Sequence, residues 1–244
     1  ASARSSKGKA IINLLELKGE KVTSVIAVKE FKDYLMMATG KGVVKRIELS
    51  NFANPRKGGI KAIKVAESED TLIGVKSLKE GEEVLLVTAK GQAIRFKSDD
   101  VRAMGRAAAG VAGIKLGKGD AVVSLEVLPK DSKFAVLTIS KKGYGKRSEI
   151  EDYRLTGRAG KGVINMKVTD KTGQIVTSQI VLGGDNVIIT TKKGIVIRSP
   201  VKNIRIMGRA TQGVRVIKLK DGDRVSDLAR IPSAEEEEKI VEGS

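Results

Sequence analysis

The stretch VLLVTAKGQAIRF, residues 84–96, has the pattern of a β-hairpin. Two apolar, β-branched runs flank a Lys-Gly pair, and glycine accepts the positive φ that tight hairpin turns need. The stretch NVIITTKKGIVIR, residues 186–198, repeats this design. An arginine follows the turn glycine by four residues each time, which gives the pairs Gly42/Arg46, Gly91/Arg95, Gly143/Arg147 and Gly194/Arg198.

A second marker has the same period and shows that the whole chain is a repeat. Glycines that open an apolar run recur in steps of 51, 51, 52 and 51 residues, at Gly8, Gly59, Gly110, Gly162 and Gly213. The first four periods each hold four strand-like runs, for example GIKAIKV, TLIGVKSL, EEVLLVTA and QAIRFKSDDV, and the fifth stops after two. Four strands in about 50 residues is the size of a propeller blade.

Composition agrees with an all-β fold. Hydrophobic residues make up 41% of the chain and aromatic residues 3%, and no segment keeps a helical 3.6-residue stripe. We therefore predict a propeller-like array of four-stranded blades. It forms one domain over residues 1–232, with repeats starting near residues 8, 59, 110, 162 and 213, followed by an acidic, disordered tail over 233–244.

The charge balance indicates a polyanionic partner. Lysine and arginine number 46 against 29 acidic residues, a net charge of +17, although Glu235–Glu238 makes the tail acidic. The chain has no histidine and no cysteine, which excludes imidazole bases, thiolate chemistry and zinc sites built from these ligands. No apolar run is long enough to span a membrane. We expect a soluble intracellular protein that has no catalytic or metal-binding residues and is not an enzyme by itself.

Arginines occupy a repeated position just before the strand-opening glycines. The same loop of every blade falls on the same rim, so these arginines predict a periodic basic belt, and guanidinium groups and glycine-loop amides bind phosphate well. For any one cation, a solvated charge that protects a strand edge is the simpler interpretation. The predicted DNA-binding residues are Arg4, Lys45, Arg46, Arg56, Lys57, Arg95, Lys97, Arg102, Arg106, Lys146, Arg147, Arg158, Lys161, Arg198, Arg205 and Arg209.

Two other residue sets have simpler structural interpretations. Tyr34, Tyr144 and Tyr153 are expected to pack rather than to cleave DNA. Asp70, Asp120 and Asp223 precede the second strand in three repeats, where aspartate commonly hydrogen-bonds turn backbone rather than a metal.

The runs MMATGKGVVKR, VRAMGRAAAGVAGIKLGKGDAVVSLEVL, KKGYGKRSEIEDY and IMGRATQGVRVIKL resemble the C-terminal domain of bacterial DNA gyrase A. The likeness extends over about residues 1–231. It implies a β-pinwheel, in which neighbouring blades exchange strands and DNA wraps around the basic perimeter to support ATP-dependent negative supercoiling. It also implies a cytoplasmic protein on the bacterial chromosome. Its partners would be duplex DNA, the catalytic part of gyrase A, and gyrase B in a holoenzyme that holds two copies of each. This domain would need no cofactor, because ATP, magnesium and the catalytic tyrosine belong to other parts of the holoenzyme.

One departure keeps alternatives open. The family's Q-R-R-G-G-K-G heptapeptide has only partial echoes here, at residues 56–59 and 158–162, and four of the family's six glycine-to-arginine hairpins are matched. The C-terminal domain of topoisomerase IV, which lacks the heptapeptide and would select DNA crossings, is the related alternative. A protein-interaction propeller for acidic partners is the alternative from another class.

Overall fold

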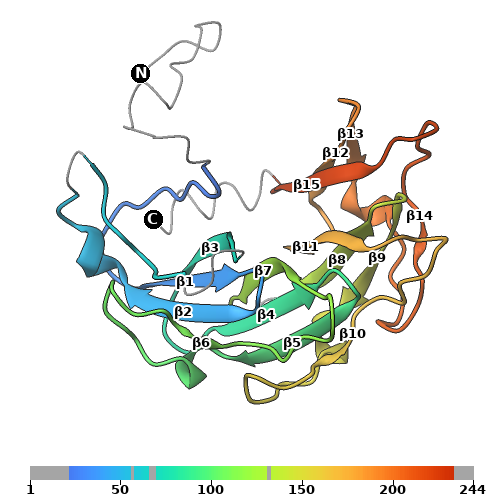
Figure 1. Cartoon of the computed structure of the whole chain (residues 1–244). Coiled ribbons are helices and arrows are strands. Elements are labelled where there is room, and N and C mark those ends of the chain that lie inside the picture. Colours follow the sequence, from blue (N-terminus) through green and yellow to red (C-terminus); the bar gives the residue numbers. More distant parts are fainter. Residues whose placement is uncertain (1–21, 56–57, 66–69, 131–132, 234–244) are drawn as a thin grey trace, which may run out of the picture.

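The computed structural model describes residues 22–55, 58–65, 70–130 and 133–233. Antiparallel strands and short 3₁₀ turns make up the regular structure of this part of the chain, as the composition predicts (Figure 1). The predicted tail falls outside it, apart from Ser233. The strands are β1 (Tyr34–Thr39), β2 (Val43–Glu48), β3 (Leu72–Leu78), β4 (Glu83–Thr88), β5 (Gln92–Lys97), β6 (Val111–Ala112), β7 (Val122–Leu128), β8 (Ala135–Ser140), β9 (Tyr144–Glu149), β10 (Val163–Ile164), β11 (Ile175–Val181), β12 (Asn186–Thr191), β13 (Val196–Pro200), β14 (Val214–Arg215) and β15 (Val225–Ile231).

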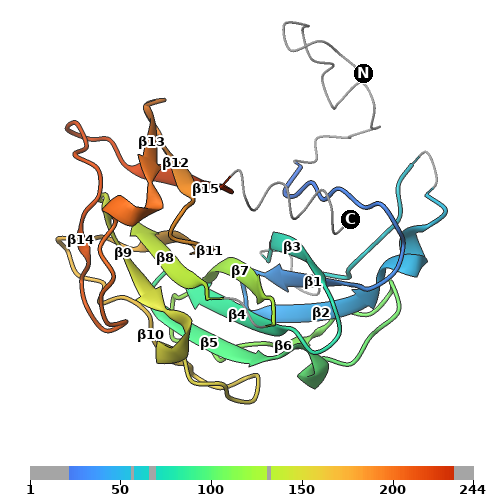
Figure 2. The same ribbon diagram turned by 180° about the vertical axis from the view of Figure 1, so that it is seen from behind.

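Four sheets form four propeller blades, which follow one another along a crescent (Figures 1 and 2). At the centre of each blade is one of the predicted hairpins, β1–β2, β4–β5, β8–β9 or β12–β13. The turn glycine of every hairpin has a positive φ, between 78° and 86°. The four repeated Gly-to-Arg pairs thus mark the four blades.

The blades exchange strands, as the family resemblance implies. In the first blade the order is β3-β1-β2-β6, and the outer strand β6 follows the hairpin of the second blade in sequence. In the same way β10 completes the second blade and β14 completes the third. After each hairpin, the chain therefore adds an outer strand to the preceding blade and then returns to form the inner strand of the blade that holds the hairpin.

The inner strands β3, β7, β11 and β15 lie next to one another along the concave side of the crescent (Figure 1). Apolar side chains between successive blades form three buried clusters, centred on residues such as Leu86, Tyr153 and Val187. The core therefore lies between blades, so each blade depends on its neighbours for burial.

The strand-opening glycines are required where the exchanged chain crosses the preceding blade. Gly162 has φ 74°, and a Cβ atom there would lie 2.2 Å from the carbonyl oxygen of Ala93. Gly213 has φ 73°, with the carbonyl oxygen of Gly145 2.6 Å from a Cβ position. Only glycine combines this backbone conformation with such a close approach.

Two strand predictions are corrected. The run GIKAIKV was expected to be a full strand, but residues 59–65 form no strand, and the equivalent runs contribute only the two-residue strands β6, β10 and β14. These segments pair only while they cross the neighbouring blade, so most of their backbone is not in a sheet. The strand predicted over residues 92–101 ends at Lys97, because a 3₁₀ turn occupies Ser98–Asp100.

The last blade also departs from the predicted four strands. It has the order β13-β12-β15, and no described segment pairs with the outer edge of β13. Val196 on this strand is 63% exposed. The equivalent edges of the other blades are covered by β6, β10 and β14.

Candidate nucleic-acid interface

Three equivalent loops, which we call the rim loops, run over residues 101–110, 153–162 and 204–213. Each follows a 3₁₀ turn and leads to an outer strand, and they lie along the convex outer side of the crescent (Figures 1 and 2). The backbone N–H groups of Met104, Thr156 and Met207 donate to the carbonyl oxygens of Arg46, Arg95 and Arg147, at 2.9, 2.9 and 2.8 Å. Each rim loop is thus fixed to the hairpin of the preceding blade.

The first arginine of each rim loop is free to meet an external anion. Arg102, Arg154 and Arg205 are all exposed, and within the described residues none of them forms an ion pair with a carboxylate. Arg102 and Arg205 were predicted from the sequence, whereas Arg154 was missed. The repeat carried the signal, because Arg154 lies 52 residues after Arg102 and 51 before Arg205.

The second arginine of the rim loops has a mixed role. Arg158 donates from Nε to the carbonyl oxygen of Asp100 at 3.0 Å and from Nη1 to that of Ala112 at 2.9 Å. Arg209 makes the equivalent bonds to Asp152, at 3.1 Å, and to Ile164, at 2.9 Å. Both guanidinium groups remain partly exposed, so they hold the loop while keeping donors directed at solvent. Arg106, at the same position in the first loop, is exposed.

A row of lysines accompanies the rim loops and was missed by the sequence prediction. Lys64, Lys115, Lys167 and Lys218 are all exposed and are separated by 51, 52 and 51 residues. Their constant place in the runs that open with the repeat glycines was the available signal. The backbone N–H of Lys115 donates to the carbonyl oxygen of Gly160 at 2.8 Å, which fixes this position beside the next rim loop.

Lys45 is buried at a junction between blades. Its Nζ donates to the carbonyl oxygens of Ala62, Arg106 and Ala108 at 2.7, 2.8 and 2.9 Å. Burial lowers the pKa of this ammonium. Arg46, its neighbour, is also buried.

The Nη1 atom of Arg46 lies 2.6 Å from Oδ1 of Asp99, and its guanidinium stacks 3.8 Å from the ring centre of Tyr34. Lys45 and Arg46 therefore hold two blades together.

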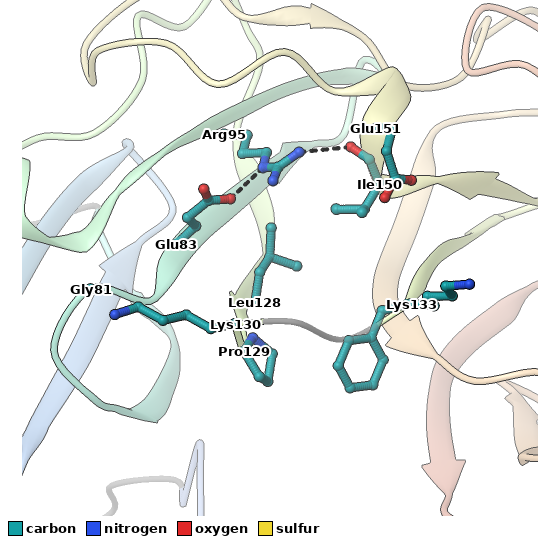
Figure 3. Close-up of a pocket in the computed structure, with 10 residues that line it drawn as sticks. Gly81, Glu83, Arg95, Leu128, Pro129, Lys130, Lys133, Ile150 and Glu151 are labelled. Atoms are coloured by element: carbon teal, nitrogen blue, oxygen red, sulfur yellow. Dashed lines mark hydrogen bonds and ion pairs between the residues drawn. The ribbon is translucent and has the colours of Figure 1, made fainter.

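Arg95 and Arg147 occupy the next two junctions. Nε of Arg95 lies 2.5 Å from Oε2 of Glu83, and Nη1 donates to the carbonyl oxygen of Ile150 at 3.0 Å (Figure 3). The same Nη1 also donates to the carbonyl oxygen of Tyr153 at 3.1 Å. Arg147 donates to the carbonyl oxygen of Ile204 at 2.6 Å, and burial lowers its pKa. Arg95 and Arg147 thus hydrogen-bond to the backbone at the 3₁₀ turn of the following blade.

Lys146 is fully buried and donates to the hydroxyl of Ser148, which donates to the carbonyl oxygen of Met207 at 2.8 Å. Burial lowers its pKa to about 8. The expectation that the hairpin cations widen a solvent-facing belt is therefore corrected, because their donors are directed at internal acceptors. The candidate interface therefore does not include the five junction cations, which are Lys45, Arg46, Arg95, Lys146 and Arg147.

The remaining predicted cations divide into two groups. Lys97, Lys161 and Arg198 are exposed. Arg198 lies on β13 of the last blade, so the described chain has no following blade to which it could hydrogen-bond. Arg4, Arg56 and Lys57 lie outside the described residues.

The predicted turn role of the repeated aspartates is confirmed. Oδ1 of Asp70 accepts from the N–H groups of Lys41 and Thr71, each at 2.9 Å, and Asp120 and Asp223 make the equivalent pairs of bonds. Over the described ranges, no cluster of acidic residues could hold a metal ion. The same part of the chain holds no helix that is long and apolar enough to cross a membrane.

The tyrosines pack, as predicted. Tyr153 is fully buried, and its hydroxyl donates to Oδ1 of Asn165 at 2.5 Å. Burial raises the pKa of Tyr153. Tyr144 is buried with Arg215 bonded to its hydroxyl at 3.1 Å, and Tyr34 lies beneath Arg46.

Comparison with known proteins agrees with this architecture. The model of the family described as "DNA gyrase C-terminal domain, beta-propeller" matches residues 1–29, 33–79, 82–129, 135–181 and 185–232, one segment per repeat. The chain belongs to this family. The DNA gyrase A protein of Staphylococcus epidermidis is 43% identical over 233 residues, and that of Salmonella typhimurium is 40% identical over 248 residues. These alignments cover 94% and 100% of the chain but 26% and 28% of the relatives, so the chain spans about a quarter of their length.

Solved structures share the fold. A DNA gyrase A C-terminal domain superposes with a TM-score of 0.82 at 27% identity, covering 95% of this chain and 78% of that one. The C-terminal domain of a DNA topoisomerase IV superposes with a TM-score of 0.87 at 23% identity, covering 97% of this chain and 74% of that one. The β-pinwheel predicted from the resemblance is therefore confirmed, and the chain is a C-terminal accessory domain of the gyrase A type.

Proposed function

We propose that this domain binds duplex DNA without sequence specificity and bends and wraps it along the rim loops. The observation that carries the proposal is the repetition of Arg102, Arg154 and Arg205 at one place in successive blades, exposed and without carboxylate partners among the described residues. A cation repeated along a convex edge offers a curved path of evenly placed charges. The phosphates of a bent duplex can follow such a path.

The chemistry of the rim supports contacts to the DNA backbone rather than to bases. The guanidinium fork binds two phosphate oxygens, and the glycines at Gly105, Gly157 and Gly208 bring the main chain close to a ligand. The described chain contains strands and short 3₁₀ turns, with no recognition helix for the major groove. Affinity therefore comes from phosphate contacts, which explains the strongly basic composition.

Within the holoenzyme, the domain would serve ATP-dependent negative supercoiling. It would present DNA to the catalytic part of gyrase A, with gyrase B supplying ATP hydrolysis, in the cytoplasm on the bacterial chromosome. Cofactors and the catalytic tyrosine would belong to those other parts. The family membership and the gyrase A relatives support this placement.

A charge-reversal experiment tests the rim. We expect the triple variant Arg102→Glu, Arg154→Glu, Arg205→Glu to bind random-sequence duplexes far more weakly. The slope of log affinity against log salt should fall by about 0.9 for each phosphate that the variant no longer neutralises. Fluorescence anisotropy at several salt concentrations and duplex lengths measures both quantities.

The control carries the same charge change away from the rim loops, at the exposed residues Lys29, Lys79 and Lys133, each changed to Glu. Equal weakening by both triples would reject the rim as the binding surface. Affinity that stops growing beyond a short duplex would favour a propeller that recognises acidic proteins instead.

A further inference from the structure

Two rim loops carry a large apolar side chain in the middle of their basic surface. Leu155 is 43% exposed and Ile206 is 48% exposed, and they occupy the same position, 51 residues apart. Each directly follows the exposed first arginine, Arg154 or Arg205. About half of each residue is therefore accessible to solvent.

The backbone holds both residues in place. Leu155 forms a parallel β-bridge with Arg95, and Ile206 forms one with Arg147. In the later of these loops the N–H of Arg147 donates to the carbonyl oxygen of Arg205 at 3.0 Å, so the bridge is anchored beside Ile206. A rigid loop therefore presents each apolar side chain.

Arginines flank each apolar side chain along the loop. Arg154 and Arg158 lie on either side of Leu155, and Arg205 and Arg209 lie on either side of Ile206. Arginines that contact phosphates from both sides of such a loop would place the residue between them over a groove. Leucine and isoleucine are among the side chains that proteins insert between base pairs from the minor groove to kink DNA.

We propose that Leu155 and Ile206 are apolar wedges that enter the minor groove of the bound duplex and partly unstack one base step each. The inference rests on the proposed function and extends it. The rim arginines hold the DNA, while the two wedges localise its bending at two loops. Flexible pyrimidine–purine steps should be preferred at the kinks, because they unstack most readily.

The first rim loop offers an internal comparison. Its equivalent residue is Ala103, which forms the same type of parallel bridge, with Arg46, but lacks a side chain long enough to insert. The first loop is therefore expected to hold DNA without kinking it. Replacing Ala103 with leucine adds a wedge at the same backbone position.

The test uses the whole 244-residue chain and a random-sequence duplex well below about 150 bp, the persistence length, so that the free DNA is nearly straight. Dyes at the two ends report bending by energy transfer, and 2-aminopurine within the duplex reports unstacking. The double variant Leu155→Ala, Ile206→Ala should reduce the rise in energy transfer at saturating protein about twofold and abolish the 2-aminopurine signal. Its salt slope should stay as in the parent, because the arginines remain.

Two further variants make the outcome decisive. The double variant Leu155→Met, Ile206→Met keeps bulky apolar side chains and should retain both signals, and Ala103→Leu should increase them. If the alanine double variant bends and unstacks DNA like the parent, the wedge proposal is overturned. That result is expected if Leu155 and Ile206 instead contact a partner protein. That outcome leaves the rim intact, because failure of the rim requires the Arg→Glu triple variant to bind DNA like its control.

Discussion

The cations at the junctions between blades and the cations on the rim loops have the same residue types but opposite surroundings. Lys45 is fully buried and bonds three carbonyl oxygens, whereas Arg102 is exposed and has no carboxylate partner among the described residues. The junction cations recur at the hairpins and the rim cations recur in the loops that follow them. The difference shows that periodic positive charge in this fold lies in two settings, one inside the junctions between blades and one exposed on the rim, where we propose that it meets DNA.

The largest expected effect comes from breaking a junction. In Lys45→Ala, the carbonyl oxygens of Ala62, Arg106 and Ala108 lose their common donor. A buried acceptor left without a partner costs about 1–3 kcal/mol. The carbonyl oxygen of Ala108 keeps the N–H of Lys64 at 3.4 Å, and the three acceptors are only partly buried, so we expect a total loss of about 3 kcal/mol in the free energy of unfolding. Urea denaturation measures it.

The same variant should bind DNA like the parent under conditions where it stays folded, because its ammonium is not on the surface. Lys133→Ala, which removes an exposed ammonium, is the matched control. A loss of stability below about 1 kcal/mol would show that water replaces the donor and that the junction is not held by this lysine.

A smaller effect is expected from Lys146, and it depends on pH. The folded protein releases the Lys146 proton near pH 8, whereas the ordinary pKa, which applies to the unfolded chain, is 10.5. Between these values the unfolded state binds more protons, so stability rises with pH across this window. Below pH 8, Lys146 is protonated in both the folded and the unfolded state, so the folded state bears the full free-energy cost of the buried charge.

Lys146→Met removes this titration. The difference in unfolding free energy between variant and parent should therefore favour the variant most below pH 8 and should shrink by an amount on the order of 2–3 kcal/mol towards pH 10.5. Chemical denaturation at a series of pH values follows the difference. The range from about pH 7 to about pH 10.5 spans both pKa values. A difference that stays constant over this range would contradict the claim that folding buries the charged Lys146 ammonium.

The smallest effect on stability is expected on the rim. Arg154→Ala removes an exposed guanidinium, so the free energy of unfolding should change by no more than about 0.5 kcal/mol. Its effect on DNA should be larger, with a fall of about 1 in the salt slope and weakening that is similar for all sequences. Sequence-dependent weakening would instead indicate contacts to base edges.

The sequence was sufficient to predict the four hairpins, and with them the four blades, and the role of the turn aspartates, because each of these depends on local chemistry. Gly91 needs a positive φ, and Asp120 bonds the backbone of the turn beside it. These requirements leave a residue-type signature at a fixed spacing. Arg102 and Arg205 were among the predicted cations, and the structure places them at equivalent, exposed positions of two rim loops.

The sequence could not separate the two kinds of cation, because burial of Lys45 depends on a segment that lies more than 60 residues away. Nor did the runs opened by the repeat glycines reveal that they pair for only two residues, since their apolar composition is that of an ordinary strand. Arg154 and the lysine row were within reach, because their spacing equals the repeat.

Strand exchange has a consequence for how such a domain can change in evolution. The outer strand β10 belongs to the sheet of β5 but is joined in sequence to the chain that continues into β11. Deleting or duplicating one 51-residue unit therefore alters two sheets at once, and the new neighbours must accept each other's borrowed strand. The crossing segments share their opening glycine and pair with the preceding blade through only two residues, so a borrowed strand makes few demands on a new neighbour, and the shared glycine positions preserve the freedom to gain or lose blades.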